Sequence, residues 1–261
     1  MQETSSRVAA AAVRQHGLAE HTARVALCLD ISGSMHRRYG DGSVAALAEK
    51  VLALAGALDP DRQVEVFLFG ERGHHPGTLT AANHADFLAT AIARFPLENA
   101  TDYGAAMTLL RRHYFGSDQP RRTPLVAEPV FVVFVTDGQT ADEDGAREQV
   151  ISASYEPVFW QFVGIGRSTR AVTPGSLARS PSPGVTARRR VSASIPACGG
   201  SGSSEFGFLE ELDTIGDRCE DNTDFFTVTD PTALPDVELF EQLLSAYPAW
   251  RTRAQHRTLL H

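Results

Sequence analysis

The residues of this chain best suited to chemistry directly follow its first apolar run. Asp30, Ser32 and Ser34 alternate with single residues after the run at positions 25–29, and Gly33 allows a tight turn there. Carboxylate and hydroxyl oxygens suit a hard divalent cation such as Mg²⁺ or Mn²⁺, whereas zinc and copper favour clustered sulfur or imidazole. Ser and Asp also cap helices that begin after a strand, so two interpretations of this pattern stay open: a metal site or a helix cap.

Two distant segments favour the metal site. Thr101 stands just before a helix-like run, and Asp137 follows a second apolar run at positions 131–135 and precedes Gly138. In an open parallel sheet, the loops that leave the carboxyl ends of neighbouring strands converge on one crevice. We therefore expect three loops to bring oxygen ligands to one point.

The combination of D-x-S-x-S with a later Thr and a later Asp-Gly resembles the von Willebrand factor type A domains that carry a metal-ion-dependent adhesion site. The resemblance implies that the hydroxyls of Ser32, Ser34 and Thr101 bind the ion directly or through water. It also implies that Asp30 and Asp137 hold metal-bound waters. All five positions of that motif are present in this chain.

Other segments are similar to a bacterial subgroup of that family, encoded with tellurium-resistance and related stress genes. This resemblance implies a stress-associated role, in which tellurite or related toxic oxyanions are the expected stress. The segments that carry it are ARVA at 23–26, WQFVGIG at 160–166, FGFL at 206–209, DNTDFF at 221–226 and YPAW at 247–250.

The order of apolar segments predicts an α/β fold with a doubly wound, mostly parallel sheet flanked by helices. Near-continuous apolar runs are typical of parallel strands that are buried on both faces. The expected strands are residues 25–30, 64–69, 130–136, 157–165 and 225–228. The expected helices are residues 44–58, 84–95, 102–115, 142–153, 205–216 and 236–246.

We expect one main domain in these 261 residues. The predicted organisation is an N-terminal helical extension at 1–22, a von Willebrand factor A-like domain at 23–250 and a C-terminal tail at 251–261. Residues 167–204, rich in Ser, Gly, Pro and Arg, are predicted to be a disordered basic insertion in the domain. Three accounts of this segment are open: a passive surface loop, an artefact of a frame slip in G+C-rich DNA, or a basic segment that binds an acidic partner.

Charge and hydropathy exclude several classes of function. The chain sums to −8, and residues 167–204 carry six arginines and no acid, so the remainder carries −14. Such an acidic body argues against nucleic-acid binding, which needs a basic face. The sequence shows neither a long apolar span nor a secretory signal, so we expect a cytoplasmic protein with no membrane span. Cys28, Cys198 and Cys219 lack metal-ligand spacing, and Cys28 is expected to be a buried apolar residue.

Two functions remain open for the five oxygen-bearing residues. In the first, the domain is a metal-dependent binding module, and a protein partner supplies an Asp or Glu carboxylate as the missing ligand. In the second, it is a hydrolase that uses the same ion as a Lewis acid. Neither Ser32 nor Ser34 lies in a G-x-S-x-G elbow, and no general base stands out, so binding is favoured. The pair His74-His75 is interpreted as part of a polar loop.

Overall fold

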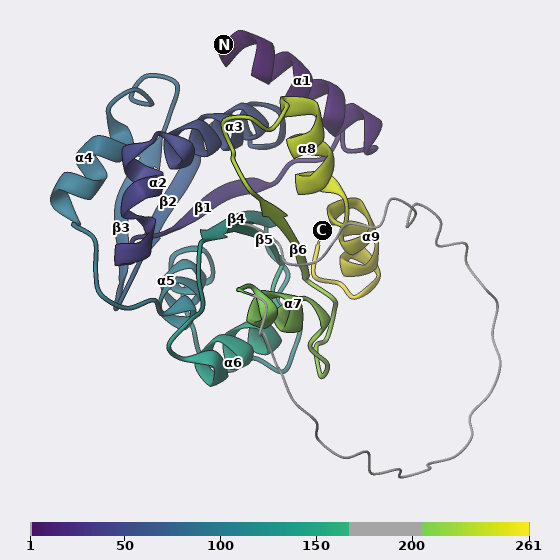
Figure 1. The fold of residues 1–261 in the computed structure, drawn as a ribbon. Coiled ribbons are helices and arrows are strands. Elements are labelled where there is room, and N and C mark those ends of the chain that lie inside the picture. Colours follow the sequence, from purple (N-terminus) through teal and green to yellow (C-terminus); the bar gives the residue numbers. More distant parts are fainter. Residues whose placement is uncertain (1, 167–204, 261) are drawn as a thin grey trace, which may run out of the picture.

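The computed structural model describes residues 2–166 and 205–260, and its centre is a six-stranded sheet in the order β3-β2-β1-β4-β5-β6 (Figure 1). All neighbouring strands pair in parallel except β2 and β3, which are antiparallel. The strands are β1 (Arg24–Asp30), β2 (Val64–Phe69), β3 (Gly73–Leu79), β4 (Val130–Thr136), β5 (Val158–Ile165) and β6 (Thr223–Val228). The predicted α/β fold with a mostly parallel sheet is thus confirmed.

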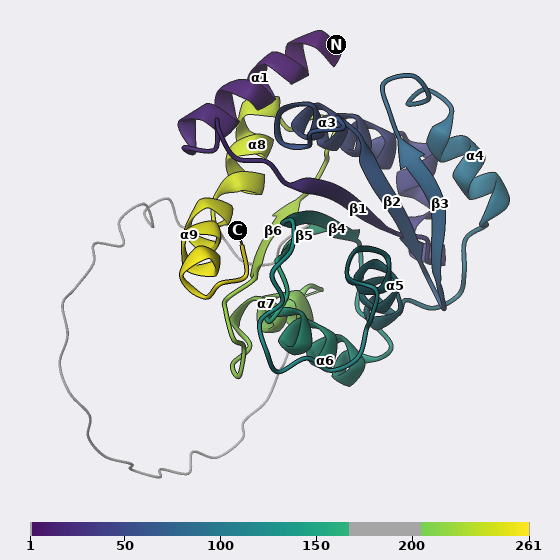
Figure 2. The ribbon, with the colours of Figure 1, turned by 180° about the vertical axis from the view of Figure 1, so that it is seen from behind.

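Helices cover both faces of the sheet, as Figure 2 shows from behind. One face carries α1 (Gln2–Gln15), α3 (Ser43–Leu58), α8 (Asp236–Leu244) and α9 (Tyr247–His256), with α4 (Phe87–Arg94) near the β3 edge. The other face carries α5 (Tyr103–Phe115), α6 (Glu143–Ala153) and α7 (Gly207–Thr214). Two short helical turns, η1 (Gly33–Met35) and α2 (His36–Gly40), follow β1.

The two faces of the sheet contribute to separate apolar clusters because side chains alternate along each strand. In β1, Val25, Leu27 and Leu29 belong to the cluster under α3, whereas Ala26 and Cys28 belong to the cluster under α5. Each of these side chains is buried. Burial on both faces explains why the strand is apolar at consecutive positions and why Cys28 behaves as an apolar residue.

The strand β3 corrects the expectation that His74 and His75 lie in a polar loop. Residue propensity does not predict a strand here, because Gly and Pro are poor strand formers. The strand contains Gly73, Pro76 and Gly77. The strand lies at the edge of the sheet and its pairing with β2 contains an irregularity between Val66 and Leu68. Edge positions and bulges are where a sheet tolerates proline.

The two ends of the described chain both pack on the domain. Helix α1 packs against α3 and α8, and Ala9, Ala12 and Val13 join the larger apolar cluster. The expected domain boundary at residue 250 falls inside α9, and Leu259 and Leu260 beyond this helix are buried. The predicted insertion at 167–204 lies outside the described residues. Among the described residues, the helices are too short or too polar to cross a bilayer.

Candidate metal centre

The site forms where the winding of the sheet changes direction. From β1 the chain continues to β2 on one side, while β4 lies on the other side of β1. Asp30 ends β1 and Thr136 ends β4, so both lie at the carboxyl edge of the sheet. Ligands in open α/β sheets bind in the crevice that such a change of direction creates. The sheet therefore places the Asp30 loop and the Asp137 loop side by side.

Four of the five predicted residues form one hydrogen-bonded chain. The backbone N–H of Ser32 donates to Asp30 Oδ1 at 2.6 Å, and the Oγ atoms of Ser32 and Ser34 are 2.9 Å apart. Ser34 Oγ in turn donates to Asp137 Oδ1 at 2.6 Å. This last contact joins side chains that are 103 positions apart in the sequence. The structure thus brings together Asp30, Ser32, Ser34 and Asp137.

Thr101, the fifth predicted residue, lies in an adjacent loop that is fixed through its backbone. The carbonyl oxygen of Thr101 accepts hydrogen bonds from the N–H of Ala141 at 2.7 Å and from Thr140 Oγ1 at 3.2 Å. The side chain of Asp102 caps α5 by accepting from the N–H of Ala105. Within the described residues, the Thr101 hydroxyl itself is in no hydrogen bond. The structure therefore places this loop beside the Asp137 loop without joining the Thr101 hydroxyl to the chain of contacts.

Thr136 is a site residue that the sequence analysis missed. Its Oγ1 donates to Asp30 Oδ2 at 2.6 Å and accepts from the N–H of Gly138 at 3.2 Å. Tyr39 adds a second contact, because its hydroxyl donates to the backbone oxygen of Asp30 at 2.9 Å. Threonine is a common residue in β-strands, so its presence at the end of β4 does not indicate a functional role. Its position directly before Asp137 was the available clue.

Burial and a like-charged neighbour make Asp30 the electrostatic centre of the site. The side chain is fully buried, and burial is the main reason why the pKa of Asp30 rises to about 6. Hydrogen bonds from Thr136 and Ser32 oppose this rise, and the charge of Asp137 adds to it. Burial and mutual repulsion disfavour the charged form of carboxylates, and a bound cation stabilises that form. The atoms that could bind a metal here are the oxygens of carboxylates, hydroxyls and the backbone, and such ligands suit a hard divalent ion.

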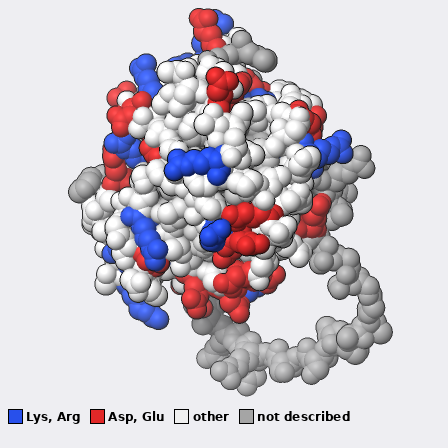
Figure 3. All heavy atoms as spheres, turned by 90° about the vertical axis from the view of Figure 1, so that its left-hand side faces the viewer, with Lys and Arg blue, Asp and Glu red and all other residues white. Residues whose placement is uncertain are grey.

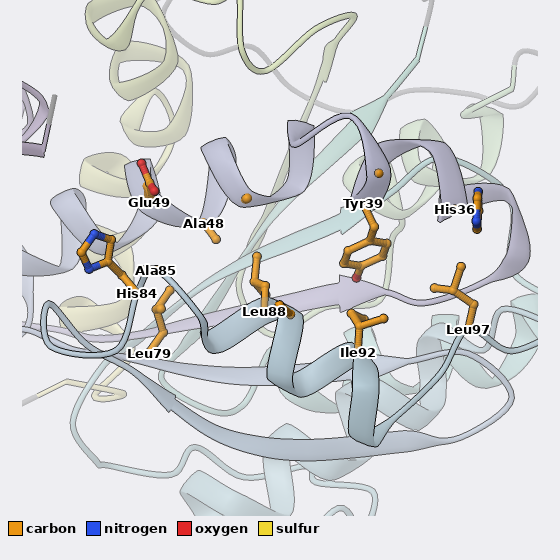
Figure 4. Close-up of a pocket in the computed structure, with 13 residues that line it drawn as sticks. His36, Tyr39, Ala48, Glu49, Leu79, His84, Ala85, Leu88, Ile92 and Leu97 are labelled. Atoms are coloured by element: carbon orange, nitrogen blue, oxygen red, sulfur yellow. The ribbon is translucent and has the colours of Figure 1, made fainter.

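An apolar pocket of about 450 Å³ lies next to this site (Figure 4). Tyr39, Leu88, Ile92 and Leu97 point into it from α2, α4 and the segment after α4. The Tyr39 ring faces the pocket while its hydroxyl bonds to the backbone of Asp30. None of the five predicted metal-site residues lines the pocket. The pocket is therefore a neighbour of the candidate metal centre and not a part of it.

The chain is similar to known proteins in sequence and in structure. The chain is 26% identical to the uncharacterized protein YcbR of Bacillus subtilis (strain 168) over 246 residues, which is 93% of this chain and 83% of YcbR. Among solved structures, an aerotolerance-related membrane protein from Bacteroides fragilis is 17% identical with a TM-score of 0.48, covering 85% of this chain and 98% of that one.

A further solved structure, proximal thread matrix protein 1 from the mussel byssus with a zinc-occupied MIDAS motif, is 17% identical with a TM-score of 0.40. The match covers 56% of this chain and 39% of that chain. The model of the vWA-TerF-like family, described as the vWA found in the TerF C terminus, matches residues 22–173 and 199–260. The chain thus belongs to the vWA-TerF-like family of von Willebrand factor A domains.

Proposed function

We propose that this protein is a metal-dependent binding module in which Asp30, Ser32, Ser34, Thr101 and Asp137 hold Mg²⁺ or Mn²⁺. The hydrogen-bonded chain from Asp30 through Ser32 and Ser34 to Asp137 is the observation that carries this proposal. It places two carboxylates and two hydroxyls at the crevice of the sheet. The Thr101 loop is held beside it and offers a third hydroxyl.

A partner carboxylate is the ligand that would complete this site. Three hydroxyls and two carboxylates leave a divalent cation short of anionic oxygen, which favours an Asp or Glu from outside. Ser34 is exposed and Asp137 is half-buried, so an ion between them would be reachable from solvent. We propose a protein partner that presents one acidic side chain to the ion.

The charge of the molecule supports a protein rather than a nucleic acid as the partner. Figure 3 shows the face over α4 and β3, where basic side chains are scattered and acidic ones gather below the centre of the view. This face offers no continuous basic surface among the described residues. Phosphate backbones need such a surface for tight binding. The family membership motivates a role in tellurium resistance or a related bacterial stress, and we propose that it is carried out in the cytoplasm.

Metal binding is tested first, by calorimetry with Mg²⁺ and Mn²⁺ on metal-free protein. Wild-type protein should bind one ion, and Asp137→Asn should lose this binding while remaining folded. Asp144→Asn is the matched control, because that carboxylate is 95% exposed and pairs with Arg147 on α6. Equal binding by the wild type and Asp137→Asn would refute the proposed site.

Partner capture is tested by pull-down from native lysate with and without a chelator. The captured partner should require the divalent metal, should be lost when its acidic residue is changed to Ala, and should bind more weakly to Thr101→Ala. Metal-dependent turnover of phosphate or ester substrates that is lost in Ser34→Ala and Asp137→Ala would instead establish the hydrolase.

A further inference from the structure

A second group of metal-binding side chains lies on the α5 face, near the β3 edge of the sheet. Glu65 of β2, His75 of β3 and His113 of α5 each offer one ligand atom, and these atoms all lie within 4.8 Å of one another. The two histidines are exposed and Glu65 is half-buried. The consecutive strands β2 and β3 and the more distant helix α5 therefore present two imidazoles and one carboxylate at one point.

The irregular pairing of β2 and β3 accounts for the position of His75. Val66 pairs with Gly77 and Leu68 pairs with His74, so His75 and Pro76 together lie opposite Phe67. A bulge of this kind redirects a side chain. The ring of His75 stacks on Phe67, with centroids 4.9 Å apart and an angle of 21° between the planes.

His113 lies against the same aromatic ring and beside His75. Its ring meets Phe67 edge to face with centroids 5.5 Å apart, and it lies 4.8 Å from the ring of His75. Each of the two rings can therefore present one nitrogen to the same point.

Glu65 is oriented in the way that metal-binding carboxylates are. Thr78 Oγ1 donates to Glu65 Oε1 at 2.8 Å, which fixes one carboxylate oxygen. The other oxygen lies 2.8 Å from His75 Nε2. Outer contacts of this kind hold ligands in position in metal sites.

This cluster is distinct from the candidate metal centre. Glu65 pairs with Ala26 near the start of β1, whereas Phe69 at the end of β2 pairs with Asp30. Along α5, His113 lies ten positions after Tyr103, which begins the helix beside the Thr101 loop. Ten residues of helix correspond to about 15 Å. The two groups therefore lie at opposite ends of α5.

We propose that Glu65, His75 and His113 bind a zinc ion that links the edge strand β3 to α5. Two imidazoles and a carboxylate suit zinc, with water in the fourth position of the tetrahedron. Tetrahedral ligands on zinc are about 3.3 Å apart, so the side chains need only a small movement toward one another. The zinc would replace the hydrogen bond between His75 and Glu65.

Zinc titration of metal-free protein by calorimetry tests this site, with Zn²⁺ alone as the probe. His75→Ala and His113→Ala should each weaken the binding of one zinc at least tenfold, and Thr78→Val should weaken it about tenfold. His256→Ala is the matched control, because His256 is an exposed histidine at the end of α9. It should leave zinc binding unchanged.

A parallel titration with Mg²⁺ separates this site from the candidate metal centre. His75→Ala should bind Mg²⁺ as the wild type does, while Asp137→Asn should keep the zinc site. His113→Gln replaces His113→Ala if the alanine variant does not unfold cooperatively. Zinc affinity that is unchanged in both histidine variants, or lost in Asp137→Asn, would overturn the proposal.

Discussion

Thr136 and Asp30 face each other across two neighbouring parallel strands, and the hydroxyl of Thr136 donates to Asp30 Oδ2 at 2.6 Å. Both side chains are fully buried. The contact supplies one of the hydrogen bonds that keep a buried carboxylate in place in the absence of solvent. It thus couples the stability of the sheet to the geometry of the candidate metal centre.

Replacing Thr136 by Val should therefore reduce both stability and metal binding. The variant keeps the shape of the side chain but leaves a buried carboxylate oxygen without its donor, which costs about 1 to 3 kcal/mol. Urea unfolding measures the loss, and calorimetry with Mg²⁺ measures the affinity. Thr252→Val, at an exposed position on α9, is the control. Wild-type stability in Thr136→Val would show that this hydrogen bond contributes nothing.

Replacing Asp30 by Asn should raise the stability of the metal-free protein at neutral pH. The pKa of about 6 shows that the folded state disfavours the charged carboxylate, and Asn removes that charge. One pKa unit corresponds to about 1.4 kcal/mol, so the rise from 3.8 to about 6 sets an upper limit of about 3 kcal/mol on the gain. The same variant should no longer be stabilised by Mg²⁺. Thermal unfolding with and without the ion measures both effects, and a metal-free variant less stable than the wild type would contradict this prediction.

Arg111 should be among the most sensitive positions outside the site. Arg111 and Glu156 are both fully buried, with Nε and Oε2 2.8 Å apart. The guanidinium also donates to the backbone oxygens of Asp118 and Gln119 at 3.0 and 3.1 Å. Among the described residues, Arg111→Met leaves Glu156 as a buried charge paired with Arg121 alone, and should cost about 3 to 5 kcal/mol.

Arg112→Met is the matched control for this variant. Arg112 is the next residue on α5, its side chain is 61% exposed, and it pairs with Asp118 on the surface. An exposed ion pair contributes about 1 kcal/mol or less. Urea unfolding of the two variants should separate them clearly. Equal losses would mean that the buried pair has no special role.

His21 should make the protein less stable as the pH falls. Burial, with a smaller effect of the Arg251 charge, lowers the pKa of His21 from 6.5 to about 4. The unfolded chain takes up a proton near pH 6.5 and the folded protein only near pH 4, so stability is lost between these values as pH falls. The loss has an upper limit of about 3 kcal/mol. Below pH 4 both states are protonated and the loss does not grow further.

The variant His21→Gln isolates this effect from the titration of nearby acids. Glutamine retains a polar contact with the Tyr247 hydroxyl, which lies 2.9 Å from His21 Nε2. The difference in unfolding free energy between the wild type and the variant should therefore shift in favour of the variant from pH 7 to pH 4. A difference that is constant across this range would show that His21 titrates alike in both states.

The sequence predicts the parts of this molecule that depend on short-range order. Asp30, Ser32 and Ser34 are neighbours in the chain, and Asp137 follows a strand whose apolar run is unmistakable. The parallel topology then brings these strand ends together, as the hydrogen bond from Ser34 to Asp137 shows. The role of these residues as metal ligands stays a prediction.

What the sequence did not predict depends on strand pairing and packing that no single segment reveals. Strand β3 exists because it pairs with β2, and its Gly and Pro content obscures that pairing in the sequence. His113 comes close to His75 only when α5 packs on this part of the sheet. Thr136 has a specific role only because Asp30 ends the adjacent strand. No local pattern encodes these relationships.

The bulge at His75 and Pro76 has a consequence for how the protein avoids unwanted assembly. An open sheet edge is a template on which another chain can add a strand and start aggregation. At the β3 edge, Pro76 has no N–H to offer, and the irregular pairing with β2 disturbs the regular spacing that an added strand needs. This edge therefore resists the addition of a further strand, which lowers the tendency of the folded protein to aggregate through its sheet.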